Sequence, residues 1–288
     1  MTTPYDYHRP KTLADAWRLF GETPGARFIA GGTDLMVRLR EGKATPRALV
    51  SLGGLSELTG IEVGDTTRIG ALTRVSDLLA HRTLAEAFPA LVSAARTLGS
   101  VQIRNLATAG GNLCNASPCA DLAPPLLVLG ARVRIESSAG ARELPLEDFF
   151  VAPGQTRLAP GEVLTAILVD RPPPGTRTTF IKKGRVRMDI SITSIAVALA
   201  LSGPKCTRAR IAAGSVGPRP MRLPRTEKLL EGRDLSPGVL REARARASEE
   251  VTPITDVRAT EAYRRHLAGV LVERAVASLL SEAEGSVR

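Results

Sequence analysis

Two pairs of neighbouring glycines, Gly31-Gly32 and Gly110-Gly111, are the residues of this sequence whose chemistry best suits an anion. Glycine tolerates positive φ angles and lets the backbone approach a ligand closely. The first pair follows a predicted strand, 26–30, and precedes a predicted short helix, 35–40, so free amides at the helix start would point at a phosphate. An ordinary turn with Asp34 as the helix cap explains the same residues, and for this pair alone it is favoured.

The second pair is predicted to form a second turn of the same kind. It is followed by short polar side chains that lie among apolar ones in the sequence. These side chains are Asn112, Asn115, Ser117 and Asp121. Packed polar groups need hydrogen-bond partners, which a ligand or the backbone of the loop itself could supply. The residues leave both interpretations open. Neither pair fits the G-x-G-x-x-G or G-x-x-x-x-G-K-S/T fingerprint, which disfavours a Rossmann domain and a P-loop NTPase.

The composition is that of an ordinary globular protein, with 43% hydrophobic and 24% charged residues in 288. The net charge of +10 is spread along the chain, and aromatic residues make up only 3%, which disfavours nucleic-acid binding and suits an acidic protein partner better. Three cysteines do not make a disulfide framework. The longest apolar stretch, 190–201, is too short for a membrane span. A cytoplasmic protein without a membrane span is expected.

The elements that position the glycines fall into three stretches. Thr12 is predicted to cap a helix over 13–20 in the first stretch, which ends with a strand over 48–52. The second stretch alternates strands and helices and ends near Arg171. Three prolines and a glycine over 172–175 cannot continue an element, so we place a domain boundary there. The third stretch has three predicted strands followed by three helices.

At the two glycine pairs the sequence resembles the FAD-binding medium subunit of the molybdenum hydroxylases, the xanthine dehydrogenase and carbon monoxide dehydrogenase type. The matching segments are 28–35 and 108–118, supported by 102–105, 120–127, 180–182, 189–191 and 209–216. Either glycine motif alone would be a weak signal. Together they are specific, and the resemblance runs over nearly the whole chain.

The resemblance implies an α+β fold. A two-part FAD-binding domain of the vanillyl-alcohol oxidase type would occupy 1–174, with subparts of about 1–52 and 53–171. A smaller α/β C-terminal domain of the molybdenum hydroxylase flavoprotein type would occupy 175–288.

The resemblance also implies that both glycine motifs surround the pyrophosphate of FAD. Carried over by matching position, the cofactor-binding residues would be Phe28, Ile29, Ala30, Gly31, Gly32, Thr33, Asp34, Leu35, Leu98, Thr108, Gly111, Asn112, Asn115, Asp121, Leu164 and Lys182. Asp189 is a weaker match, near the edge of the flavin ring. Without the resemblance, Lys182 reads as a surface lysine beside Lys183.

Such subunits relay electrons and do not oxidise the substrate themselves. The resemblance implies a molybdopterin-containing large subunit, a small subunit with two 2Fe–2S clusters, and a dimer of heterotrimers. Electrons would pass from the iron–sulfur subunit to FAD and then to NAD, oxygen or another acceptor. No catalytic residue is expected in this chain, and its three histidines form no cluster with metal-ligand spacing.

Cys114 and Cys119 do not make an iron–sulfur site by themselves, because a cluster normally takes four thiolates and the chain has three cysteines. We therefore expect structural roles for them and no metal site. Two alternatives to the relay subunit remain open: a self-standing flavin oxidoreductase of the same fold, and, more weakly, a non-enzymatic interaction or nucleic-acid-binding protein.

Overall fold

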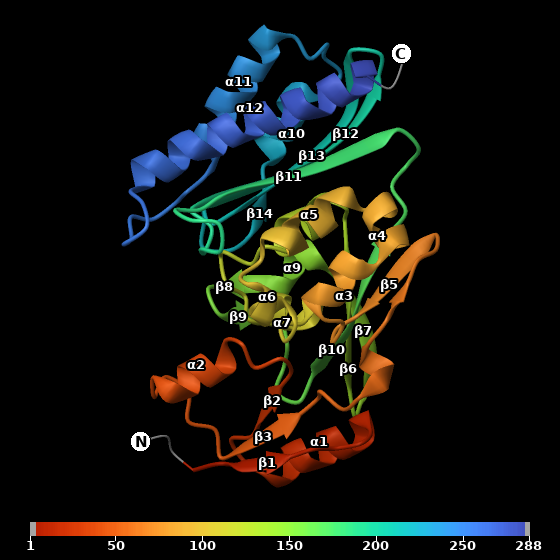
Figure 1. Ribbon diagram of the computed structural model, residues 1–288, viewed down its shortest axis with the longest axis vertical. Coiled ribbons are helices and arrows are strands. Elements are labelled where there is room, and N and C mark those ends of the chain that lie inside the picture. The colour runs from red at the N-terminus through yellow and green to blue at the C-terminus, as the bar shows by residue number, and fades with distance from the viewer. Residues whose placement is uncertain (1–3, 286–288) are drawn as a thin grey trace.

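Three sheets follow one another along the long axis of the molecule, in the order of the chain (Figure 1). The computed structural model describes residues 4–285. The N-terminal part, residues 4–52, has a parallel sheet of strand order β1-β3-β2. Its elements are β1 (Asp6–His8), α1 (Leu13–Glu22), β2 (Arg27–Ile29), α2 (Leu35–Arg40) and β3 (Ala48–Ser51). Thr12 caps α1, as predicted, by accepting a hydrogen bond from the backbone of Asp15 at 3.1 Å.

The middle part, residues 53–171, contains an antiparallel sheet of order β4-β5-β10-β6-β7 and a small β8-β9 pair. Its elements are η1 (Ser56–Leu58), β4 (Ile61–Glu62), β5 (Thr66–Gly70), α3 (Val75–Ala80), α4 (Arg82–Ala87), α5 (Pro89–Thr97), α6 (Val101–Arg104), α7 (Ala109–Cys114), α8 (Ala123–Val128), β6 (Arg132–Ser137), β7 (Gly140–Pro145), α9 (Leu146–Phe149), β8 (Phe150–Ala152), β9 (Gln155–Thr156) and β10 (Val163–Asp170).

The C-terminal part, residues 175–285, has an antiparallel sheet of order β11-β12-β13-β14. Its elements are β11 (Thr176–Lys183), β12 (Thr193–Ser202), β13 (Lys205–Gly214), β14 (Met221–Arg222), α10 (Pro224–Leu230), α11 (Pro237–Glu250) and α12 (Glu261–Gly285). Helices α10 and α12 cover one face of this sheet, and α5 and α8 of the middle part cover the other. Within the described residues, no helix combines the length and apolar character that a bilayer crossing requires.

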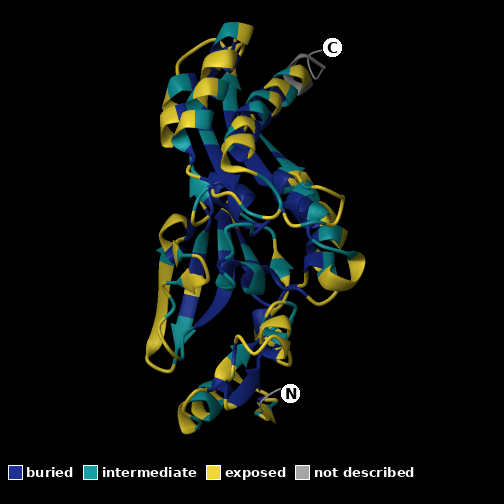
Figure 2. Cartoon of the chain, turned by 90° about the vertical axis from the view of Figure 1, so that its left-hand side faces the viewer, coloured by how far each residue is buried: buried dark blue, intermediate teal, exposed yellow. Residues whose placement is uncertain are grey.

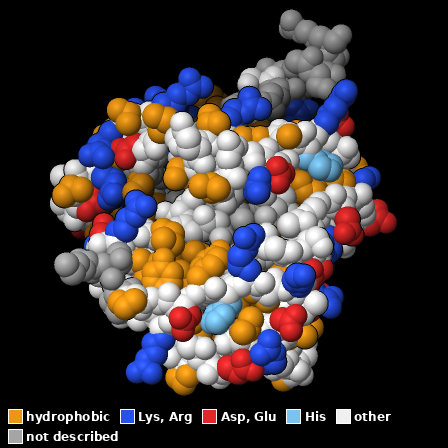
Figure 3. All heavy atoms as spheres, turned by 60° about the horizontal axis from the view of Figure 1, so that its bottom comes forward, with side chains coloured by type: hydrophobic (Ala, Val, Ile, Leu, Met, Phe, Trp, Pro, Cys, Tyr) orange, Lys and Arg blue, Asp and Glu red, His pale blue; other side chains and the backbone are white. Residues whose placement is uncertain are grey.

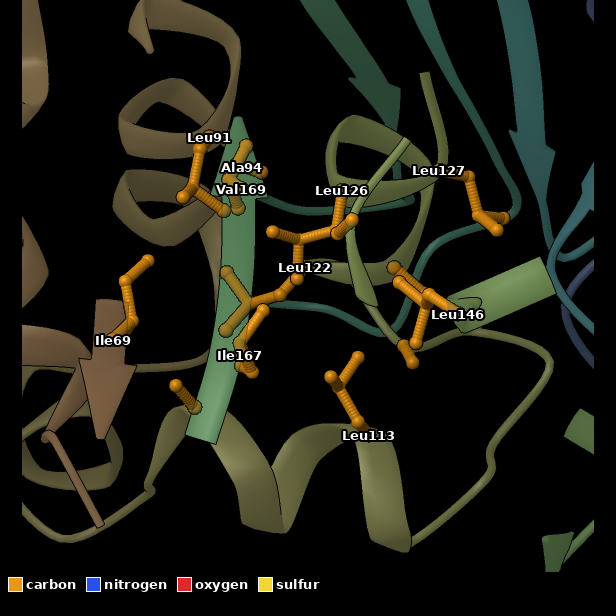
Figure 4. Packing of buried hydrophobic residues seen from close by; sticks show 14 of the residues in the cluster. Ile69, Leu91, Ala94, Leu113, Leu122, Leu126, Leu127, Leu146, Ile167 and Val169 are labelled. Atoms are coloured by element: carbon orange, nitrogen blue, oxygen red, sulfur yellow. The ribbon is translucent and has the colours of Figure 1, made fainter. Parts of the chain in front are cut away.

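The largest core lies in the middle part, where α5, α7 and α8 pack on β10 (Figure 4). Leu113, Leu122 and Ile167 meet there with no more than 1% exposure. The same core extends to Phe180 and Ala198 of the C-terminal sheet, so the two parts share a packed face. Figure 2 shows the buried residues running through all three sheets, with exposed residues in loops, on outer helix faces and along strand β7.

The chain mixes helices and sheets, as the expected α+β fold class requires, and its last sheet forms a smaller C-terminal part with α10, α11 and α12. The division at residues 174 and 175 stays a prediction. The short strands β1, β4, β8, β9 and β14 are absent from the sequence-based predictions, because segments this brief carry no measurable alternation of apolar and polar residues.

Candidate functional site

The first glycine loop, residues 30–34, connects the end of β2 to the start of α2. Gly31 lies directly against the middle part, where a Cβ atom would sit 1.9 Å from the carbonyl oxygen of Leu106. Gly32 has a φ of +71°, which side chains other than glycine rarely adopt. The two glycines therefore have different reasons to be glycine: close packing for the first and backbone conformation for the second.

The backbone N–H groups of this loop are available to a ligand. Within residues 4–285, the amides of 31–34 donate to no main-chain or side-chain acceptor of the protein. Backbone donors without partners are costly when removed from water, so a site that covers this loop must supply acceptors. Four successive free donors suit an anion with several oxygen atoms.

The second glycine motif, residues 108–112, is not the turn that the sequence predicts. Gly110 and Gly111 lie inside the first turn of α7, and Thr108 is its N-cap. Gly110 packs on β5 and its following loop, where a Cβ atom would meet the Cβ of Ala71 at 2.6 Å. The prediction of a second turn is wrong because a pair of glycines does not by itself break a helix that has a cap and a packed face.

The amides of the second glycine motif are already used within the protein. Ala109 donates to the carbonyl of Thr73 at 2.9 Å, and Gly110 donates to that of Ala71 at 2.8 Å. The Gly111 amide donates to Thr108 Oγ at 3.1 Å. The motif therefore offers a ligand side chains rather than backbone donors. The Thr108 hydroxyl accepts the capping bond, and its own proton is left to donate.

A polar bridge joins the two glycine regions. Asn115, at the end of α7, donates through Nδ2 to Asp34 Oδ1 at 3.1 Å. Arg38 of α2 donates through Nη2 to Asn115 Oδ1 at 3.0 Å. The Asp34 carboxylate, which would repel a phosphate, is thus held by Asn115 at the end of α7. The bridge therefore connects the N-terminal part to the middle part.

The two glycine regions open onto one cleft of about 500 Å³, within the range of about 300–1,000 Å³ that is usual for small-molecule sites. Figure 3 shows this end of the molecule, hollowed near its centre, with hydrophobic side chains gathered beside backbone atoms. Most predicted site residues line the cleft: Phe28, Ile29, Ala30, Gly31, Gly32, Thr33, Asp34, Leu35, Leu98, Thr108, Gly111, Asn112, Asn115 and Leu164.

Several residues of the cleft were missed by sequence reasoning, among them Arg27, Arg38, Ile103 and Leu158. Arg38 follows Asp34 by four residues, which places both on one face of α2, and this spacing could have indicated it. Ile103 is 38% exposed, an unusual position for isoleucine that only the folded chain reveals. Leu158 comes from a loop with no sequence signal of its own.

Two predicted site residues, Asp121 and Lys182, do not line the cleft and instead bind each other. Lys182 Nζ donates to Asp121 Oδ2 at 2.7 Å and to the Thr97 carbonyl at 3.0 Å. The Lys182 side chain is only 6% exposed, so the interpretation as a surface lysine is wrong. Asp121 Oδ1 is buried without a partner among the described residues. Burial outweighs the nearby lysine and raises the pKa of Asp121 to about 6.

Asp189, the weaker match, also lies outside the cleft and pairs with Arg185 at 2.6 Å in the β11–β12 connection. Cys114 lines the cleft, and burial raises the pKa of its thiol to about 12, so it stays protonated near neutral pH. In the part of the chain that the structure describes, no three His, Cys, Asp or Glu residues gather as metal ligands would.

Two family models together match most of the chain. A model described as the FAD binding domain in molybdopterin dehydrogenase matches residues 3–172. A model described as the CO dehydrogenase flavoprotein C-terminal domain matches residues 178–279.

Two relatives of similar length match this chain over nearly its whole length. The chain is 32% identical over 286 residues to the xanthine dehydrogenase FAD-binding subunit of Escherichia coli O157:H7, covering 98% of each chain. It is 35% identical over 274 residues to the carbon monoxide dehydrogenase medium chain of Afipia carboxidovorans, covering 94% of this chain and 95% of that one.

Solved structures show the same architecture. A chain of Cu,Mo-CO dehydrogenase superimposes with a TM-score of 0.91 at 35% identity, covering 96% of this chain and 98% of that one. A chain of quinoline 2-oxidoreductase from Pseudomonas putida 86 superimposes with a TM-score of 0.93 at 28% identity and covers 100% of both.

Proposed function

Because the chain belongs to the FAD-binding subunits of the molybdenum hydroxylase family, we propose that its cleft holds FAD with the pyrophosphate against the first glycine loop. The observation that carries this placement is the row of free amides at 31–34. A pyrophosphate presents several charged oxygens at close spacing, which backbone donors in a row can satisfy together.

The rest of the cleft fits the same group. Thr108 brings a hydroxyl donor, and Asn112 and Arg38 add polar groups along the same wall. Leu98, Ile103 and Leu164 supply apolar surface for flat ring systems. The predicted cofactor contacts of Asp121 and Lys182 would require their ion pair to face the ligand, and these contacts stay a prediction.

Within a complex, the chain would relay electrons. We infer this role from the relatives, which are described as subunits or medium chains of dehydrogenases. A molybdopterin-containing large subunit would oxidise the substrate, an iron–sulfur subunit would deliver electrons to FAD, and NAD, oxygen or another acceptor would receive them. The chain's own part is to bind FAD, orient it and shape its surroundings. A dimer of heterotrimers and a cytoplasmic location belong to the same proposal.

A comparison of flavins tests the placement of the pyrophosphate. The full chain, purified and then stripped of flavin, is titrated with FAD, FMN and riboflavin while flavin fluorescence is recorded. We expect near-stoichiometric binding of FAD, much weaker binding of the two flavins without a pyrophosphate, and competition by ADP. Equal affinity for FAD and FMN would contradict a pyrophosphate site at the first glycine loop.

The relay role needs a separate experiment. The subunits that co-purify with the chain from its source are identified together with their metals, and bound flavin is followed spectroscopically after substrate is added. We expect flavin reduction only when the partner subunits are present. Reduction and steady-state turnover by the lone chain would instead favour a self-standing flavin oxidoreductase.

A further inference from the structure

A second hollow, of about 280 Å³, lies at the junction of the middle and C-terminal parts. Its walls are the end of α8 near Gly130, the linker over 171–175 (green, at the right of Figure 1), and the inner face of the C-terminal sheet. It shares no lining residue with the cleft described above. The hollow is therefore a site separate from the first cleft.

Strand register creates this hollow. Ala198 pairs with Arg210, while Ala200 lies between Thr176 on one side and Arg208 on the other. Residues two apart on a strand share a face of the sheet. The small side chains of Ala198 and Ala200 therefore form the bottom of the hollow, and the long side chains of Arg208 and Arg210 lie beside them on the neighbouring strand. Thr176 completes the row on the opposite side.

The cationic side chains around the hollow have no protein partners. In the described range, 4–285, the guanidinium groups of Arg171, Arg208 and Arg210 form neither an ion pair nor a hydrogen bond. This contrasts with Arg222 nearby, which is paired with Glu227. Burial, followed by the charges of Arg222 and Arg208, lowers the pKa of Arg210, and the carboxylates of Glu227 and Glu147 oppose this shift only in part. The hollow therefore carries positive charge that no direct ion pair neutralises.

Asp170, the carboxylate that lines the hollow, makes no ion pair with these arginines. Asp170 accepts hydrogen bonds from Arg132 at 2.7 and 3.2 Å and from the Thr66 hydroxyl at 2.6 Å. These bonds lower the pKa of Asp170 and occupy its oxygens. The guanidinium groups of Arg171, Arg208 and Arg210 are therefore available to bind an anion from solution.

We propose that this hollow binds a phosphate group, either free or at the end of a small metabolite. The planar guanidinium group matches the oxygens of a phosphate in geometry. Three guanidinium groups suit a ligand with two negative charges, such as a phosphate, better than they suit a carboxylate with one. Arg171 from the linker and Arg208 and Arg210 from β13 would hold one anion together, which links the middle and C-terminal parts. The Thr176 hydroxyl adds a neutral donor.

Thermal unfolding of the FAD-saturated full chain tests this site, because FAD keeps phosphate out of the first cleft. Inorganic phosphate, AMP and citrate are each titrated at constant ionic strength, with chloride as the reference. We expect phosphate to raise the unfolding temperature saturably, as a ligand of the folded state does. If AMP raises the unfolding temperature at a lower concentration than phosphate does, the ligand of the hollow is a phosphorylated metabolite. If phosphate acts at the lower concentration, the ligand is the free ion.

Variants locate the effect. Arg210→Gln and, separately, Arg208→Gln should reduce the phosphate affinity at least tenfold by isothermal titration, whereas Arg82→Gln should not. Arg82 is a matched control because it is 91% exposed on α4, and its loss changes the net charge equally. The proposal is overturned if phosphate gives no saturable effect, if citrate binds more tightly than phosphate, or if Arg208→Gln and Arg210→Gln bind phosphate like the wild type.

Discussion

The first glycine loop and the second glycine motif have similar sequences but opposite backbone chemistry. Residues 31–34 leave their amides free, whereas the amides of Ala109, Gly110 and Gly111 all donate within the protein. The first region can therefore bind an anion through its backbone, and the second acts as a brace that contributes side chains. In each pair the first glycine, Gly31 or Gly110, packs closely on a distant segment, and the hydrogen bonds show which of the two regions has backbone donors to offer.

The largest effect is expected from Gly31→Ala in the first glycine loop. The new Cβ would collide with the Leu106 carbonyl at 1.9 Å, and backbone on both sides must move. Overpacking of this kind costs about 3 kcal/mol or more, and the chain should lose both stability and bound FAD. Urea unfolding and flavin content measure the two losses. Gly21→Ala in α1, where a Cβ meets nothing within 4 Å, is the control and should be neutral or stabilising.

The next effect concerns the polar residue that follows the second motif, Asp121. Its folded pKa of about 6 lies above its ordinary value of 3.8, so the folded state holds this proton more tightly than the unfolded state does. The stability contributed by the group is present below about pH 4 and is lost as the pH rises to 6, by roughly 2–3 kcal/mol. Urea unfolding from pH 4 to 7 should show this decline relative to Asp121→Asn. Parallel pH profiles of the two proteins would mean that the buried pair is already ionised at pH 4.

A smaller effect is expected from charge at Gly111, which lines the cleft from the second motif. Gly111→Asp and Gly111→Asn add side chains of nearly equal size, and only the first adds a negative charge beside the proposed pyrophosphate. We expect the Kd for FAD to be at least ~10-fold higher in Gly111→Asp than in Gly111→Asn, which corresponds to a difference of about 1.4 kcal/mol in the free energy of binding. Fluorescence titration measures both constants. If the two variants bind FAD alike, the phosphates do not lie near α7.

The smallest effect comes from the cap of the second motif. Thr108→Val removes the acceptor of the Gly111 amide, whereas Thr108→Ser keeps it. Loss of a helix cap costs about 1 kcal/mol, so the Val variant should be destabilised by that amount in urea while the Ser variant stays near wild type. No comparable cap supports α2, where Asp34 makes no capping bond. Equal stability of both Thr108 variants would show that α7 does not depend on its cap.

Much of the local structure follows from the sequence alone. The Thr12 cap, the strand before Gly31 and the helix after Asp34 are all as predicted, because caps and hydrophobic periodicity act over a few residues. The two glycine motifs, with the segments that support them, resemble the family to which the chain belongs. Sequence reasoning failed at Gly110-Gly111, because whether neighbouring glycines end a helix depends on contacts with Ala71 and Thr73 that lie far away in the chain.

The tertiary structure alone decided which groups are free and which are used. The sequence could not show that Gly31 abuts Leu106, that Lys182 is buried against Asp121, or that Arg208 and Arg210 border a hollow with alanines at its floor. Each of these features joins segments that are distant along the chain, and their contacts depend on how sheets and helices pack. Residue types therefore indicated an anion site, while packing determined which backbone can hold the anion.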